Sequence, residues 1–270
     1  MMIDKTYQKK HELWLNILFA SFSIEDEAIK SRLYDFSQIA FRHMKWLAKE
    51  ILQRGDEYNY DRNMQLLKRE STFEVLNALH EEIKNIQTDY PDNVLGHRMK
   101  TDDNYLISYI EELLSHEVNN KQITAFNMER EWEDLDQEQI DALTLFLFDE
   151  SYKEYELILI YSYMQARTKD LLEFDIYQDL IDESHFHLKS FGNMMARLGI
   201  LALPRELHEM TYIIKDLDQF VKDGIDEEIA AKEMCKELSD AINDEKLSKF
   251  FDFINYQENY HIELMKQLLK

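Results

Sequence analysis

The stretch from residue 140 to residue 165, IDALTLFLFDESYKEYELILIYSYMQ, decides how this chain folds. Its apolar residues recur every three or four positions, which predicts one long helix with an inward stripe. That stripe includes two acidic residues, and consists of Ile140, Leu143, Leu147, Glu150, Glu154, Leu157, Ile158, Tyr161 and Gln165. An ionised carboxylate in an apolar interior costs several kcal/mol unless a cation or a proton compensates it. The stripe therefore predicts a compensating charge nearby, and a metal ion is the obvious one.

A matching pair lies near the end of the chain, where Glu258 precedes His261 by three residues. Residues three apart on a helix project from neighbouring positions and can bind one ion together. His261 falls on the apolar stripe of its helix, and Glu258 lies one step toward the edge of that stripe. A Glu-x-x-His sequence alone occurs by chance in many helices, so its weight here comes from its combination with Glu150 and Glu154.

Composition favours an all-α protein. Only 5 glycines and 2 prolines occur in 270 residues, which leaves long helices between the breaks. Ser23 is the expected N-cap of the second helix, and a charged link at 131–137 divides an expected domain 1–134 from a domain 135–270. The expected helices are at about 4–22, 24–54, 63–89, 102–131, 137–168, 170–199, 205–222, 226–242 and 245–270.

Charge and hydropathy exclude several classes of protein. A formal net charge of −23 without a basic patch opposes binding to nucleic acid. No stretch approaches the roughly 18 apolar residues of a membrane span, and the N-terminus lacks the apolar core of a signal peptide. We therefore expect a soluble, cytoplasmic protein. Because Cys235 is the only cysteine, disulfides, Cys-rich zinc sites and a rubredoxin-type iron centre within this chain are excluded.

A reversal of the chain near residue 169 would bring Glu183 level with Glu154 in an antiparallel helical hairpin. His187 lies on the apolar stripe of the second helix of that hairpin, with Glu183 at the edge of the stripe. Asp182 and His185 form a competing pair, with tighter ligand spacing but on a less apolar face. Periodicity favours Glu183 and His187, and His185 remains a candidate.

Two residues are candidates for the third carboxylate ligand, Glu227 and Glu206. A reversal near residue 243 would bring Glu227 level with Glu258 and His261. Glu227 begins the stripe Glu227, Ala231, Met234 and Leu238 of the preceding helix. Glu206, at the edge of the helix expected at 205–222, is the alternative.

The combination of these motifs resembles the ferritin-like di-iron carboxylate proteins, including the rubrerythrin group, mainly over residues 137–270. The resemblance implies a ferritin-like four-helix bundle in the C-terminal half, which would hold two iron ions, or manganese, that react with dioxygen or peroxide. The chain departs from the family pattern on the helix of His187, where the family usually has Glu-x-x-His. The metal ligands that the resemblance suggests are Glu150, Glu154, Glu183, His187, His185, Glu227, Glu258 and His261.

The N-terminal half repeats this plan in a divergent form, with His11, His43 and His116 on its expected helices. Ala40 stands three residues before His43, where the family motif would have Glu. On the third expected helix, Glu70 and Glu74 point away from the apolar stripe. We expect a second, divergent helical bundle in which His43 and His116 are core residues rather than metal ligands.

The expected function is an oxidoreductase or peroxidase that uses dioxygen or peroxide. An external electron donor would be needed, since the chain has no rubredoxin-like cysteine cluster. Two alternatives stay open: an iron-binding or storage protein without turnover, and a metal-free helical interaction module. The module requires buried Lys or Arg beside Glu150 and Glu154, and the predicted inward stripes offer little of either. The organic substrate and the oligomeric state, a homodimer included, are left open.

Overall fold

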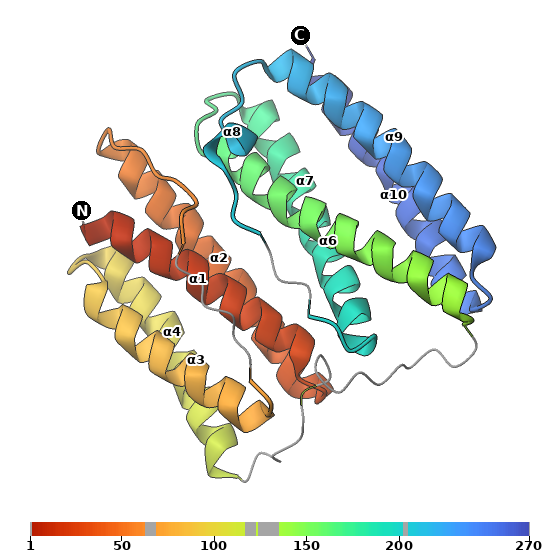
Figure 1. Cartoon of the computed structure of the whole chain (residues 1–270). Coiled ribbons are helices and arrows are strands. Elements are labelled where there is room, and N and C mark those ends of the chain that lie inside the picture. Colours follow the sequence, from red (N-terminus) through yellow and green to blue (C-terminus); the bar gives the residue numbers. More distant parts are fainter. Residues whose placement is uncertain (1, 63–68, 117–122, 124–134, 202–204, 270) are drawn as a thin grey trace. The chain divides into compact units, whose positions relative to one another are not determined.

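The computed structural model of this chain describes residues 2–62, 69–116, 123, 135–201 and 205–269 (Figure 1). Every regular element that these residues form is a helix, so the expected all-α class is confirmed. The elements are α1 (Met2–Ser23), α2 (Glu27–Gln53), α3 (Thr72–Ile86), the 3-10 helix η1 (Gln87–Asp89), α4 (Val94–Ser115), α6 (Gln137–Gln165), α7 (Leu171–Arg197), α8 (Glu209–Tyr212), α9 (Leu217–Ala241) and α10 (Glu245–Leu268).

The chain divides into two compact units. Unit 1 comprises Met1–Glu129 and Ala196–Leu207, and unit 2 comprises Arg130–Met195 and His208–Lys270. The sequence predicts a single boundary, between residues 134 and 135. The structure places the first boundary a few residues earlier and also assigns 196–207 to unit 1, which a single cut through the chain does not allow.

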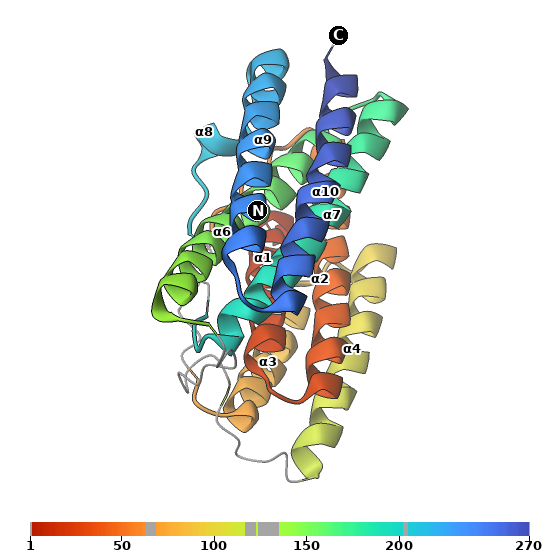
Figure 2. The same cartoon turned by 90° about the vertical axis from the view of Figure 1, so that its right-hand side faces the viewer.

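The described residues of unit 1 form four long helices. α1 packs along α2 and α3, and α3 packs along α4 (Figures 1 and 2). As the periodicity predicts, the side chains that these helices bury against one another are mainly apolar. They include Leu13, Trp14, Leu33, Leu47, Leu76, Ile83, Met99 and Ile110. Burial of such side chains is worth about 1.5–3 kcal/mol each and is the main force that holds the helices together.

Unit 2 contains α6, α7, α9 and α10, with the short α8 between α7 and α9. α9 runs beside α10 in both views of the ribbon (Figures 1 and 2). The ring of Phe146 on α6 packs edge-on against Phe191 of α7 and Phe251 of α10, at 5.6 and 5.3 Å between ring centres. These aromatic contacts join three helices at one end of the unit.

Both helical hairpins of unit 2 turn where the sequence predicts. α6 ends at Gln165 and α7 begins at Leu171, while α9 ends at Ala241 and α10 begins at Glu245. Local caps fix the starts of these helices. Asp136 forms a capping box with Gln139 at α6, and Asp244 accepts the first free N–H groups of α10.

Some expected helix boundaries are wrong. Ser23 ends α1, where its hydroxyl donates to the carbonyl of Phe19, and Asp26 caps α2 instead. No long helix covers 205–222, because the chain forms only the four-residue α8 there before α9 starts. α9 then runs straight through Gly224, which lies between the helices expected at 205–222 and 226–242.

At two of the glycines inside helices, Gly96 of α4 and Gly224 of α9, a neighbouring atom approaches closely. A Cβ on Gly96 would lie 1.8 Å from the carbonyl oxygen of Pro91, and one on Gly224 would lie 2.4 Å from the terminal methyl of Met265. α4 starts at Val94, earlier than the expected 102, and Asn93 caps it by accepting a hydrogen bond from the N–H of Gly96. The expected helix at 102–131 ends in residues that lie largely outside the described part of the chain.

Within the described residues, none of the helices has the length and apolar character that crossing a membrane requires.

Candidate metal centre

The deepest contact of unit 2 joins Glu154 of α6 to His187 of α7. The imidazole Nδ1 of His187 lies 2.7 Å from Glu154 Oε1, and both side chains are buried. The other ring nitrogen, Nε2, lies 3.3 Å from the side-chain oxygen of Gln257 on α10. The two hairpins are thus connected through one histidine, at the level where the inward stripes of α6 and α7 meet.

Glu258 of α10 lies between the two buried histidines. Its Oε2 is 2.7 Å from Nδ1 of His261, and its Oε1 is 3.9 Å from Nδ1 of His187. The centres of the two imidazole rings are 5.6 Å apart. One carboxylate therefore faces two imidazoles with different oxygens, which is how a carboxylate shared between two ions would be placed.

Two further carboxylates surround His261. Its Nε2 is in contact with Oε2 of Glu183 on α7, and its Nδ1 lies 3.8 Å from Oε1 of Glu228 on α9. Glu228, Glu258 and His261 each offer a ligand atom within 4.8 Å of the other two. All four long helices of unit 2 thus place an acidic side chain in this cluster.

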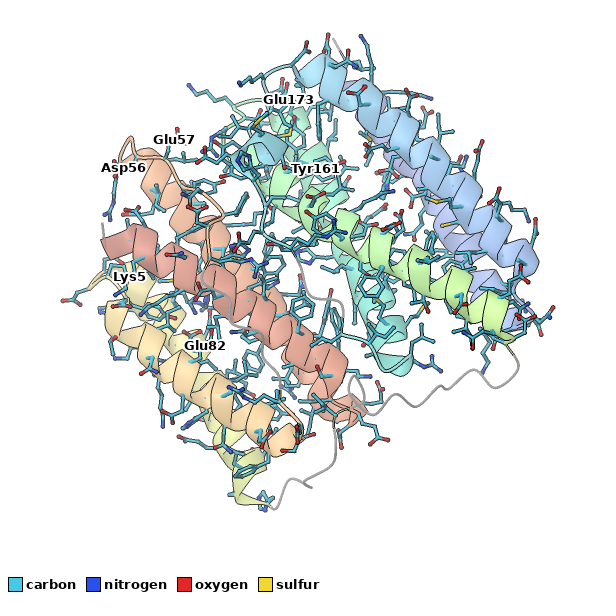
Figure 3. The ribbon with its side chains drawn as sticks, viewed as in Figure 1. Lys5, Asp56, Glu57, Glu82, Tyr161 and Glu173 are labelled. Atoms are coloured by element: carbon cyan, nitrogen blue, oxygen red, sulfur yellow. The ribbon has the colours of Figure 1, made fainter. Side chains whose placement is uncertain are left out.

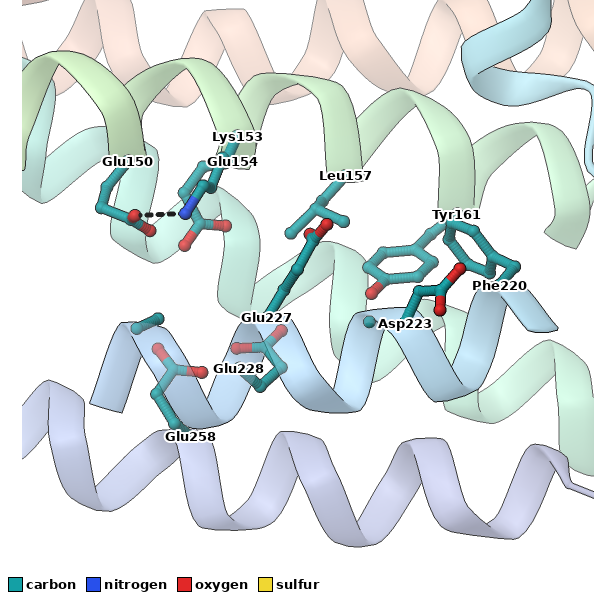
Figure 4. A pocket seen from close by; sticks show the side chains of 12 residues that line it. Glu150, Lys153, Glu154, Leu157, Tyr161, Phe220, Asp223, Glu227, Glu228 and Glu258 are labelled. Carbon is teal, nitrogen blue, oxygen red and sulfur yellow. Dashed lines mark hydrogen bonds and ion pairs between the residues drawn. The ribbon is translucent and has the colours of Figure 1, made fainter. Parts of the chain in front are cut away.

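A cavity of about 80 Å³ lies beside the cluster. Glu154 points into this space from α6, as do Glu228 from α9 and Glu258 from α10 (Figure 4). Tyr161 of α6, which is buried, also lines this space (Figures 3 and 4). The cavity offers a polar, partly closed space in which a small ligand could reach the carboxylates.

Glu150 is buried on the same face of α6, four residues before Glu154, but its contact is different. Its Oε1 accepts a hydrogen bond of 2.7 Å from the ammonium of Lys153 (Figure 4). The side chain of Lys153 is 38% exposed, whereas that of Glu150 is 8% exposed. Glu150 therefore lies between solvent-accessible Lys153 and the buried cluster.

Protons are tightly bound in this cluster when no cation is present. Burial, with the nearby charge of Glu228, raises the pKa of Glu258 to about 8. Burial alone would lower the pKa of His187, but the charge and hydrogen bond of Glu154 raise it to about 9. The pKa of His261 is raised strongly for the same reason, by Glu183, Glu228 and Glu258. The histidines are thus held as imidazolium ions by their acidic neighbours.

In spite of these ion pairs, some buried polar atoms of the cluster have no hydrogen-bond partner among the described residues. Glu154 Oε2 is buried and has no hydrogen-bond partner among the residues that the structure describes. A buried carboxylate oxygen without a donor is costly, so it marks a position that a ligand would stabilise. Carboxylate oxygens and imidazole nitrogens together are a donor set that iron or manganese accepts. The residues present therefore fit such an ion.

The structure brings together five of the residues that the sequence analysis selected: Glu154, Glu183, His187, Glu258 and His261. Asp182, the competitor of Glu183, is exposed and accepts a hydrogen bond from Gln178. His185 is buried, but it lies two positions from His187 and so points about 160° away from it around α7. The contacts of the cluster involve His187, as periodicity favoured.

The expectation that Glu227 lies on the inward face of α9 is wrong. Glu227 is exposed and lies at the rim of the cavity, whereas Glu228 is the residue near His261. The inward stripe of α9 passes through Val221, Glu228 and Cys235, which are seven residues apart. Reading Met234 rather than buried Cys235 as the core residue shifted the expected stripe by one position. Glu206, the alternative, is exposed and belongs to unit 1.

The helix of His187 differs from the Glu-x-x-His pattern in a specific way. Ser184, which is buried, stands three residues before His187, where the pattern has Glu. Glu183 is one position earlier, and its carboxylate reaches His261 rather than His187. The carboxylate that α7 contributes, Glu183, is therefore paired with His261 of α10 and not with His187 of its own helix.

Unit 1 has a buried ionic network of a different composition. Lys10 of α1 is completely buried, and its ammonium donates to both oxygens of Asp103 on α4, at 2.9 and 2.8 Å. The hydroxyl of Tyr90 also donates to Asp103. Hydrophobic periodicity does not reveal Lys10, because helical patterns assign lysine to the solvent face. Burial lowers the pKa of Lys10, while Asp103 opposes this effect.

The histidines of unit 1 lie in different surroundings. His43 is buried as expected, with Nε2 3.1 Å from Asp102, and burial together with the charge of Lys10 lowers its pKa to about 4. His11 is buried beside Trp14 and Tyr60, and burial lowers its pKa to about 3. His116, which we expected in the core, is exposed. Glu70 and Glu74 are exposed, as their position off the stripe predicted.

Comparisons with known protein families, with curated proteins and with solved structures find no match to this chain.

Proposed function

We propose that unit 2 is a di-metal carboxylate protein, a ferritin-like bundle that binds two ions of iron or manganese and uses dioxygen or peroxide as an oxidoreductase or peroxidase. One observation supports the proposal most strongly. The two oxygens of Glu258 face two different buried histidines, inside a ring of carboxylates drawn from all four long helices. Four-helix bundles that bind paired metals likewise bring carboxylates and histidines of facing helices to one level of the core.

The side chains divide into two ligand groups around Glu258. Glu183, Glu228 and His261 would hold one ion, and Glu154 and His187 would hold the other, with Glu258 shared. Glu150 would join the second group after release from Lys153. When bound, two such ions supply the electrons and the Lewis acidity that reduce or cleave an O–O bond.

The protein itself would orient and shield the site. Gln257 hydrogen-bonds Nε2 of His187 and so holds the ring, leaving Nδ1 toward Glu154. Burial, together with the charges of Glu228 and Glu154, raises the pKa of Tyr161, so that this cavity residue keeps its hydroxyl proton. An electron donor from outside the chain would complete each turnover.

The rival proposal is a metal-free polar core, and one observation favours it. With both histidines protonated, the contacts of 2.7 Å at His187 and His261 are satisfactory ion pairs by themselves. Five carboxylates, at Glu150, Glu154, Glu183, Glu228 and Glu258, then face only two imidazolium ions and Lys153. Five negative charges against three positive charges leave an excess that protons must neutralise, as the raised pKa of Glu258 indicates.

Metal analysis of the purified protein tests the proposal. Protein prepared without chelators and supplied with Fe²⁺ or Mn²⁺ should contain close to two ions per chain. Glu154→Ala and His261→Ala should each lose at least one ion, while Glu263→Gln, an exposed residue of the same helix as His261, should keep both. Circular dichroism would establish that each variant is folded. Metal-free parent protein, or full metal content in both site variants, would overturn the proposal.

Activity is tested on the same samples. Protein that holds two iron ions should consume dioxygen or hydrogen peroxide when a chemical reductant is supplied. Loss of this consumption in His261→Ala, with retention in Glu263→Gln, is the expected result. Two bound ions with no consumption of either oxidant would leave a binding or storage protein instead.

A further inference from the structure

We infer that the cavity between α6 and α9 is the entrance through which divalent cations reach the cluster, and that the ammonium of Lys153 is a displaceable counter-ion inside this entrance. This inference rests on the proposed metal site and specifies how that site is filled.

The cavity joins exposed acidic residues to buried ones. Asp223 and Glu227 of α9 are exposed and line its outer part, while Glu154 and Glu258 line its inner part and are each more than nine-tenths buried. Figure 4 shows these side chains along one side of α6, with Glu227 beside Leu157. A cation that enters from solvent thus meets a continuous series of carboxylates.

The unsatisfied oxygen of Glu154 gives this series an end point. Glu154 Oε2 is buried, lines the cavity, and has no hydrogen-bond partner within the described part of the chain. Acidic residues at a surface are common and do not by themselves make a site. Here the surface acids lead to a buried carboxylate oxygen that lacks a partner.

The size of the cavity limits what can pass. Its volume of about 80 Å³ has room for several water molecules, since about 10–15 Å³ of such volume is enough to hold one. A metal ion that has lost part of its hydration shell fits this space. So do dioxygen and peroxide.

Lys153 is the one basic residue among those that line the cavity. Its ammonium is bonded to Glu150 at 2.7 Å, and the charges of Glu150 and Glu227 support its protonated form. Because its side chain is 38% exposed and has a flexible four-carbon stem, it can turn toward solvent without unfolding the helix. An entering dication would replace it beside Glu150.

The difference from Lys10 of unit 1 is informative. Lys10 is completely buried and bonded to both oxygens of Asp103, so it cannot leave without opening the core. Lys153 makes one bond at the edge of a cavity. We therefore treat Lys10 as a permanent counter-ion and Lys153 as an exchangeable one.

The first test is the rate at which Co²⁺ enters the metal-free protein, followed by its visible absorption in a stopped-flow instrument. The double variant Asp223→Asn with Glu227→Gln should load about fivefold more slowly than the parent at about 0.01 M salt. At about 1 M salt, where the screening length is about 3 Å, the two rates should converge. The matched control removes two exposed acids of α9 outside the cavity, Glu233→Gln with Glu237→Gln, and should load at the parental rate.

The second test is equilibrium affinity for Co²⁺. Lys153→Met should bind Co²⁺ at least about fivefold more tightly, since no ion pair must be broken. Lys249→Met, which removes an exposed lysine of α10, should bind as the parent does. Parental loading by the double variant would overturn the entrance, and parental affinity in Lys153→Met would overturn the counter-ion, in each case without affecting the proposed metal site. A parent that binds no Co²⁺, Mn²⁺ or Fe²⁺ would overturn both the site and its entrance.

Discussion

The buried pair of Lys10 and Asp103 allows a sharp test of how charge is balanced inside unit 1. Lys10→Met keeps the length and the apolar stem of the side chain but removes the ammonium. Asp103, which is 5% exposed, would then lose two hydrogen bonds of 2.9 and 2.8 Å and keep the one from Tyr90. Breaking a buried ion pair by removing one partner typically costs about 3–5 kcal/mol.

The double variant Lys10→Met with Asp103→Leu should recover most of this loss. Replacing both members of a buried ion pair by apolar residues is often neutral or stabilising. We therefore expect the free energy of unfolding of unit 1 to fall by about 3–5 kcal/mol in Lys10→Met, and the double variant to be about 2 kcal/mol or more above that single variant.

Urea unfolding followed by tryptophan fluorescence in a Trp132→Phe background measures these differences, because Trp14 is completely buried in α1, four residues after Lys10. The slope of the transition should stay constant, so that the midpoints report stability. A loss below about 1 kcal/mol in Lys10→Met would refute the reasoning, as would a double variant no more stable than the single one.

Four further predictions follow from the same charges and contacts. His43 becomes protonated below pH 6.5 in the unfolded chain, whereas burial in the folded chain lowers its pKa to about 4. The free energy of unfolding of unit 1 should therefore fall by about 3 kcal/mol as the pH falls from about 6.5 to 4. Unfolding measured across this pH range should show a smaller fall in His43→Gln. Glu228→Gln should reduce the metal content of unit 2 and Glu227→Gln should not, and elemental analysis after dialysis distinguishes the two. Gly96→Ala should lower the free energy of unfolding by more than about 2 kcal/mol, because the new methyl group would overlap a backbone oxygen. Gly224→Ala should change it by less than about 1 kcal/mol, since the flexible end of Met265 can move and alanine favours the helix. Thermal melts compare the two variants. Saturating Mn²⁺ should raise the midpoint of unit 2 by circular dichroism and leave the Trp14 transition of unit 1 unchanged; equal shifts in both transitions would contradict a site confined to unit 2.

The sequence predicts the helices and the level of the cluster better than it predicts individual orientations. The hairpin turns near residues 169 and 243 follow from the breaks in periodicity, and with them the level at which Glu154, Glu183 and His187 meet. Matching distances from a turn places residues to within about one helical turn of each other. That precision is enough to bring the right helices to the right level.

Two features of the structure cannot be predicted from hydrophobic periodicity: the orientation of α9 and the burial of Lys10. On α9 the apolar residues are sparse, so a stripe through Met234 and a stripe through Cys235 fit the pattern almost equally, and they place Glu227 or Glu228 inward. Only packing, which buries Cys235 completely, decides between them. The buried lysine is the second feature, since any hydrophobic periodicity assigns Lys10 to the surface.

The two units neutralise their buried carboxylates in two different ways. Each has carboxylates and histidines inside a set of four long helices, and each must neutralise the acidic groups it buries. In unit 1 the neutralising charge belongs to Lys10, which is held in the core, and the charge of Lys10 helps to keep His43 neutral. In unit 2 the carboxylates outnumber the fixed cations, so their charge is balanced by protons on His187, His261 and Glu258, which are exchangeable. A dication that displaces those protons gains ligands already in place, whereas in unit 1 it would have to expel a buried ammonium. If unit 2 holds the proposed metal site, a response to metal is expected of the cluster around Glu258, because its compensating protons can leave.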